Sequence, residues 1–138
     1  MGRIVATVNI HNLTSEGKSK KIDVLVDTGA SYLTLPLAWK QDFGSFNTEE
    51  MVDLQTATQD VVQGLVCGPV QIKVEGFRAV YNEVLFLDMQ PNGGEYEPLL
   101  GYIVLEQCGA IRGRYPFLLK DYSTFFSLKG SVPLLMFI

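Results

Sequence analysis

The sequence places one aspartate where a carboxyl group could take part in chemistry. Asp27 follows the apolar run Val24-Leu25-Val26, and Thr28 and Gly29 come directly after it. A run of β-formers that ends in a small β-branched residue and a glycine predicts a strand followed by a rigid turn at the edge of a core. The pattern therefore predicts a carboxyl group held in a fixed position, which suits acid–base catalysis.

Other catalytic chemistries have few suitable residues in this sequence. His11 is the only histidine, it falls in an expected strand, and no motif for an oxyanion site accompanies it. Cys67 and Cys108 lie far apart, so we expect neither a disulfide framework nor a metal site, and Cys108 falls at an apolar helical position where a buried, inert thiol is expected. Glycine-rich phosphate loops are absent too. We therefore expect no metal and no cofactor.

A second motif lies much later in the chain, where Leu99-Leu100-Gly101 opens a helix-like segment. In this order and at this separation, it and Asp27-Thr28-Gly29 resemble the retropepsin-like aspartic proteases, most closely the small bacterial members, over about residues 3–111. The resemblance implies an all-β, single-lobe closed barrel (the acid-protease fold) with one or two short helices. It also implies that Leu99, Leu100 and Gly101 interlock with the aspartate loop and support it beneath the active site.

The activity implied by this resemblance is that of an aspartic endopeptidase with a polypeptide substrate. Peptide hydrolysis without a metal or a covalent nucleophile needs one carboxylate to activate water and one protonated carboxyl to polarise the carbonyl. Because the sequence holds a single copy of the motif, the second carboxyl must come from another chain. We therefore expect a homodimer with Asp27 facing its symmetry mate across a two-fold axis.

The resemblance also gives roles to the residues around the aspartate. Thr28 would donate a hydrogen bond across the axis, Gly29 would let the backbone approach the carboxylates, and Ser31 would support the loop or contact peptide. Ala30 completes this active-site loop. The segment 55–60 corresponds to the flap that closes over bound peptide, with four candidate substrate-binding residues: Thr56, Ala57, Thr58 and Gln59.

A second function remains open from the residues alone. A catalytically weak or inactive dimer of the same fold could bind an extended peptide or act as a scaffold. The absence of glycine before Gly64 in the flap favours this alternative. The intact Asp27 motif favours the enzyme, because burying a pair of carboxylates costs several kcal/mol that a purely structural site has little reason to spend.

Length and composition limit the class of protein. At 138 residues the chain fits a single domain, 1–138, and with 47% hydrophobic and 19% charged residues it is expected to be globular. The net charge of −4 disfavours nucleic-acid binding. We see neither a signal peptide nor an apolar run long enough to span a membrane, so we expect a soluble, cytoplasmic protein without membrane contact.

The pattern of apolar residues predicts a succession of short strands. We expect strands at 5–10, 21–26, 51–55 and 61–66, further strand-like runs at 31–36, 70–74 and 80–87, and short helices at 36–43 and 102–108, the second ending at Gly109. Turn residues divide the runs at 68–69, 75–76 and 92–94. After Ala110 the resemblance fades, and residues 112–116 are basic and turn-like.

Overall fold

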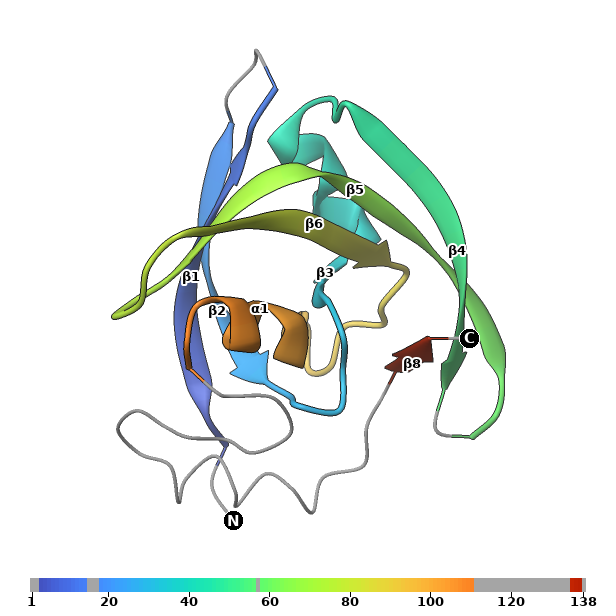
Figure 1. Cartoon of the computed structure of the whole chain (residues 1–138). Helices are drawn as coiled ribbons and strands as arrows, with labels where there is room; N and C mark the ends of the chain where they lie inside the picture. Colours follow the sequence, from blue (N-terminus) through green and yellow to red (C-terminus); the bar gives the residue numbers. More distant parts are fainter. Residues whose placement is uncertain (1–2, 15–17, 57, 111–134, 138) are drawn as a thin grey trace.

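The computed structural model describes residues 3–14, 18–56 and 58–110, and the backbone of 135–137. Most of these residues lie in strands of one sheet, whose order is β1-β2-β7-β3-β6-β5-β4-β8 (Figure 1). The strands are β1 (Val5–Asn12), β2 (Ser19–Val26), β3 (Leu33–Pro36), β4 (Thr48–Thr56), β5 (Val61–Val74), β6 (Val80–Leu87), β7 (Leu99–Leu100) and β8 (Leu135–Phe137), and the helices are η1 (Leu37–Phe43) and α1 (Tyr102–Gln107).

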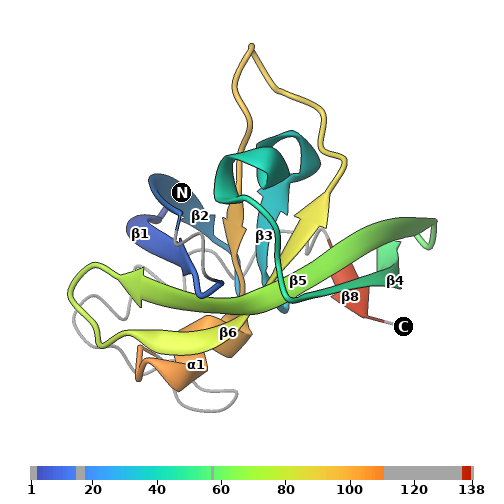
Figure 2. The same ribbon diagram turned by 90° about the horizontal axis from the view of Figure 1, so that it is seen from above.

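The sheet closes into a ring because β1 pairs with two neighbours. It is antiparallel to β2 through residues 5–11 and to β5 through residues 8–12. Figure 2 shows how this pairing brings the first strand against the long central one, while β4 and β8 extend beyond the ring. The expected all-β fold with two short helices is thus confirmed, although the strand that completes the ring, β7, contains only two residues.

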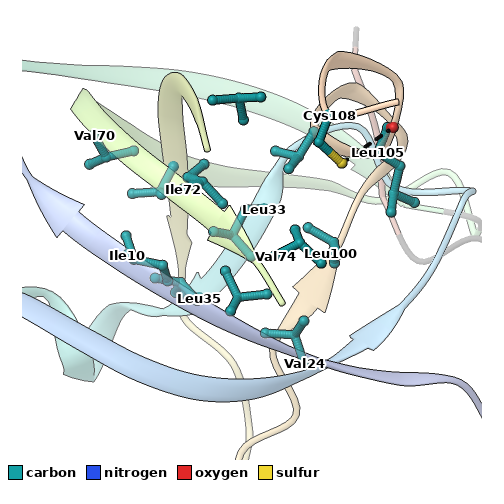
Figure 3. Close-up of a cluster of buried hydrophobic side chains, with 14 of the residues drawn as sticks. Ile10, Val24, Leu33, Leu35, Val70, Ile72, Val74, Leu100, Leu105 and Cys108 are labelled. Carbon is teal, nitrogen blue, oxygen red and sulfur yellow. Dashed lines mark hydrogen bonds between the residues drawn. The ribbon is translucent and has the colours of Figure 1, made fainter. Parts of the chain in front are cut away.

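The core fills the ring with the inward-facing residues of each strand. In the neighbouring strands β1 and β2 the buried residues alternate as the sequence pattern predicts, and Val8, Ile10, Val24 and Val26 all point into the core. Figure 3 shows side chains of this cluster, and those labelled come from β1, β2, β3, β5 and β7 and from α1 with the residue that follows it. The labelled side chains are Ile10, Val24, Leu33, Leu35, Val70, Ile72, Val74, Leu100, Leu105 and Cys108.

Helix η1 covers one end of this core with aromatic rings. The predicted helix at 36–43 is present, but as a 3₁₀ helix that begins after Pro36. Phe43 is fully buried, with its ring centroid 6.2 Å from that of Phe46 and 5.9 Å from that of Phe86. Trp39 packs edge-on against Tyr96 at 6.0 Å. These aromatics therefore pack against the body of the protein, as expected from the sequence.

The prediction of a turn at Gly68-Pro69 is wrong. Strand β5 runs without interruption from Val61 to Val74, and the pair causes only a register shift against β6 between Cys67 and Val70. Proline has no N–H to donate, and strands accommodate it where the ladder is irregular. Gly68 is buried, and a Cβ there would lie 2.9 Å from the Glu83 side chain. The predicted turns at 75–76 and 92–94 are present.

Helix α1 follows β7 and is short. It spans Tyr102–Gln107, and the chain leaves it through Cys108 and then Gly109, whose φ of 87° is typical of a glycine after a helix. Among the described residues, neither helix has the length and apolar character needed to cross a membrane. The expected basic turn at 112–116 lies outside the described residues.

Candidate active site

Strand β2 and strand β7 together position Asp27. The two run parallel, with Leu25 opposite Leu99 and Val26 opposite Leu100. The ladder continues one residue further, because the backbone N–H of Asp27 donates to the Leu100 carbonyl oxygen at 3.0 Å. Asp27 is therefore anchored by its backbone to a strand more than seventy residues away in the sequence.

A tight turn after β2 fixes the carboxyl group itself. The N–H of Ala30 donates to the Asp27 carbonyl oxygen at 3.1 Å, and the N–H of Gly29 donates to Oδ1 of the Asp27 carboxyl at 2.9 Å. The residue keeps only 9% of its surface exposed. One carboxyl oxygen is thus held by the turn, and the group as a whole is restricted to one small region of the surface.

Burial changes the acidity of this group. Loss of water around the carboxyl raises the pKa of Asp27 above the ordinary 3.8, and the hydrogen bond from Gly29 opposes part of that rise. A carboxyl with a raised pKa keeps its proton to higher pH than an ordinary aspartate, which favours a role as a proton donor. The electrostatics of Asp27 therefore suit acid–base catalysis.

The start of α1 locks the far side of the loop. Tyr102 N–H donates to the Ala30 carbonyl at 3.0 Å, and Ile103 N–H donates to the Ser31 carbonyl at 3.2 Å. Gly101 makes this approach possible, since a Cβ at that position would lie 2.4 Å from the Ser31 carbonyl oxygen. The loop residues and Leu99-Leu100-Gly101 thus form one hydrogen-bonded unit.

The predicted flap is the tip of the β4–β5 hairpin. Thr56 N–H donates to the Asp60 carbonyl and Gln59 N–H to the Thr56 carbonyl, both at 2.9 Å. Gln59 adopts a φ of 73°, and its side-chain carbonyl accepts a hydrogen bond from Gln55 at 3.1 Å. The Thr58 hydroxyl lies 3.0 Å from that of Thr56 and donates to the Asp60 carboxylate at 3.1 Å.

These hydrogen bonds join the exposed residues of the tip to one another. The structure thus places Thr56, Thr58 and Gln59 together in one turn. It describes no contact between them and the Asp27 loop. Ala57, the fourth predicted flap residue, lies outside the described residues.

Sequence reasoning missed the residues that connect the hairpin to the aspartate loop. Leu54, Val66 and Leu85 form a small buried cluster, with partly buried side chains packed around it: Tyr32, Val52, Val62 and Leu87. Tyr32 directly follows Ser31, so this cluster links the hairpin to the strand that leaves the loop. The pKa of the Tyr32 phenol is raised by burial and by the nearby Glu83 and Glu50 carboxylates. The sequence offered one signal for including Tyr32, namely that it directly follows Ser31 of the predicted active-site loop.

Comparisons with known proteins agree with this arrangement. Residues 6–104 match the family model described as "Aspartyl protease". The protease of EIAV, solved in complex with the inhibitor HBY-793, is similar in structure, with a TM-score of 0.58 over 78% of this chain and 89% of that one, at 22% sequence identity. A comparison with curated protein sequences found no match.

The family match covers well over half of the chain, and the fold is that of a retroviral protease. The chain therefore belongs to the aspartyl protease family, and it is an aspartic-type hydrolase of the retropepsin-like kind.

Proposed function

We propose that two copies of this chain form a homodimeric endopeptidase in which each Asp27 supplies one carboxyl of the catalytic pair. One observation carries the proposal: a nearly buried aspartate with a raised pKa sits in a turn whose backbone is hydrogen-bonded to Leu100 and to the start of α1. The single copy of the motif supports a shared site, because one carboxyl cannot both activate water and polarise the substrate carbonyl.

The two carboxyls share one proton, so one acts as the acid and the other as the base. Two carboxyl groups a few ångströms apart do not both ionise, because their negative charges repel each other. One Asp27 therefore keeps a proton while the other accepts one from water. The paired carboxyls of aspartic proteases are the reference example of this behaviour. Gly29 N–H, which donates to Oδ1, holds each carboxyl in orientation, and Thr28 is assigned a hydrogen bond across the two-fold axis.

The substrate in this proposal is an extended polypeptide. It lies between the tip of the β4–β5 hairpin and the loop from Asp27 to Ser31, with its backbone hydrogen-bonded to both. Thr56, Thr58 and Gln59 then contact substrate from the hairpin side, and Ala57, which lies outside the described residues, remains the fourth candidate for substrate binding.

A mixing experiment tests the shared site. Wild type and Asp27→Asn are co-refolded in equal amounts, and cleavage of an unstructured protein such as denatured casein is measured at mildly acidic pH. Random pairing leaves about a quarter of the wild-type activity if both carboxyls are needed, whereas a site complete in one chain leaves half. The exposed Asp23→Asn provides the control, since it removes a charge from β2 without touching the loop. Full activity of pure Asp27→Asn would refute the proposal.

The alternative function, a peptide-binding module with little turnover, is favoured by one observation. The hairpin tip has no glycine, and side-chain hydrogen bonds tie Gln55, Thr56, Thr58, Gln59 and Asp60 together. A tip held in this way could retain a bound peptide without the movement that turnover needs. Wild type that binds extended peptides but cleaves none of them would establish this alternative.

A further inference from the structure

Strand β4 is an edge strand that is covered only in part. On one side it pairs with β5 from Thr48 to Gln55, and on the other it pairs with β8 at Leu54, Gln55 and Thr56 alone. Among the described residues, the outer edge from Thr48 to Asp53 has no strand partner. Such an edge offers a row of N–H and C=O groups to which an extended peptide can add as a further strand.

The direction of the backbone identifies the residue that offers these groups to β8. Thr56 N–H points toward β5, because it donates to the Asp60 carbonyl. Directions alternate along a strand, so the N–H and C=O of Gln55 point to the outer edge. Met136 lies directly opposite Gln55 in the register, and the two therefore form the hydrogen-bonded pair of this ladder.

The same end of β4 is connected to the aspartate loop. Leu54 is fully buried in the small cluster with Val66 and Leu85, against which Tyr32 packs. Tyr32 follows Ser31, whose carbonyl is bonded to the start of α1. A peptide on the outer edge of β4 thus docks on a strand that packs against the continuation of the Asp27 loop.

We infer that Leu135–Phe137 of this same chain occupies the outer edge of β4 around Gln55, the docking edge for extended substrate, and acts there as an intramolecular competitor of that substrate. The segment adds antiparallel to β4 (Figure 1), and it belongs to the stretch Val-Pro-Leu-Leu-Met-Phe-Ile, which has no charged side chain. The inference extends the proposed function, since the edge is assigned to that site's substrate.

Amide exchange tests the ladder without requiring cleavage. Hydrogen exchange of the Gln55 amide is followed by NMR in the full chain, in a variant that lacks residues 135–138, and in Met136→Pro. The deletion removes the Met136 carbonyl that accepts from the Gln55 amide, and proline at position 136 disturbs the strand pairing. In both variants, exchange of the Gln55 amide should accelerate about tenfold or more. Phe137→Pro is the matched control, because its N–H points away from β4 and proline is tolerated at such a position.

Binding in trans tests the docking edge. A fluorescein-labelled Val-Pro-Leu-Leu-Met-Phe-Ile peptide is titrated into the full chain and the shortened variant, with anisotropy as the readout. The tethered segment competes at roughly millimolar effective concentration. If the segment and the free peptide both bind with a Kd of ~0.1 mM, the segment weakens binding of the free peptide about tenfold. The shortened variant should therefore bind the peptide about tenfold more tightly, and its KM for a fluorogenic apolar peptide should fall by a similar factor with kcat unchanged.

The outcomes separate this inference from the proposed function. Equal Gln55 exchange in all variants overturns it, as does a shortened variant that sediments as a monomer while the full chain is a dimer, because the segment would then be a subunit-contact strand. If the labelled peptide binds the shortened variant and protects Gln55 although no variant cleaves any substrate, the docking edge stands and the endopeptidase proposal fails.

Discussion

The backbone N–H of Asp27 donates to the carbonyl oxygen of Leu100 at 3.0 Å, and this contact ties the aspartate to β7. Without it the turn would rest on β2 alone, a strand whose outer residues are exposed. Because β7 leads directly into α1, and α1 bonds back to Ala30 and Ser31, the loop is supported from both sides. The position of the carboxyl therefore depends on residues 99–103 as much as on the motif that contains it.

We expect Gly101→Ala to be strongly destabilising. The residue has an ordinary φ of −86°, so strain does not come from its backbone angles. It comes from the added Cβ, which would lie 2.4 Å from the Ser31 carbonyl oxygen and 2.7 Å from that of Tyr32. The free energy of unfolding should fall by about 3 kcal/mol, as in other overpacked sites, measured by urea denaturation.

Gly76→Ala is the matched control for that variant. Gly76 has a φ of 93° with nothing within 4 Å of a Cβ, so the cost is confined to backbone strain of about 1 kcal/mol. If the two variants lose equal stability, close approach to Ser31 is not what requires glycine at 101.

Asp27→Asn should change how stability depends on pH. In wild type the folded carboxyl holds its proton more tightly than the unfolded one, since burial raises its pKa above 3.8. The free energy of unfolding therefore falls as pH rises from 3.8 through the raised pKa. The amide has no such loss, so the variant gains stability relative to wild type across this window and keeps the gain at neutral pH.

Thermal melts from pH 3 to pH 8 measure this difference. Asp23→Asn controls for the loss of one charge, because its side chain is exposed. A stability difference between Asp27→Asn and wild type that does not vary with pH would show that the pKa of Asp27 is the same in the folded and unfolded chain, and would contradict the raised pKa.

Thr58→Ala should alter substrate binding more than stability. The hydroxyl is exposed, and among the described residues its hydrogen-bond partners are Thr56 and Asp60, both in the tip. Surface changes of this kind usually move stability by no more than about 0.5 kcal/mol. The freed tip should change KM for a peptide substrate by several-fold. A lower melting temperature with unchanged KM would assign the tip a structural role only.

Cys67 should resist alkylation in the folded protein. The thiol is fully buried, and burial, with smaller effects from Glu49 and Glu83, raises its pKa to about 11. At pH 8 roughly one thiol in a thousand is then ionised, so labelling by iodoacetamide should be at least a hundredfold slower than in urea. Mass spectrometry identifies the labelled residue, and rapid labelling of Cys67 would contradict the closed core.

Local patterns in the sequence were sufficient for the Asp27 turn, the alternation of Val24 and Val26, and the glycine turn at Gly109 that follows α1. In each case the signal lies within a few residues of the feature it predicts. Cys108 is also buried as expected, with its thiol donating to the Leu105 carbonyl at 3.6 Å (Figure 3).

Features that depend on distant pairing were not predictable in the same way. Gly68-Pro69 has the composition of a turn, but pairing of β5 with three other strands keeps the chain extended through it. The partner of β8 is decided by which edge is left open in the folded sheet, and its three residues contain no signal for β4. Tyr32 likewise acquires its neighbours Glu50 and Glu83 only when β4 and β6 are assembled.

The length of β5 determines which neighbouring strands hold the hairpin. Residues 70–74 of this strand are paired into the ring with β1, whereas residues 61–68 pair with β4 in the hairpin. The register shift between Cys67 and Val70 lies at the boundary between the two parts. Residues 64–67 of β5 also pair with β6, so among the described residues only the part of the hairpin beyond Gly64 is held by the pairing of β4 with β5 and β8 alone. A force applied at Gln59 therefore reaches the ring at Gly64, where β6 begins to pair with β5.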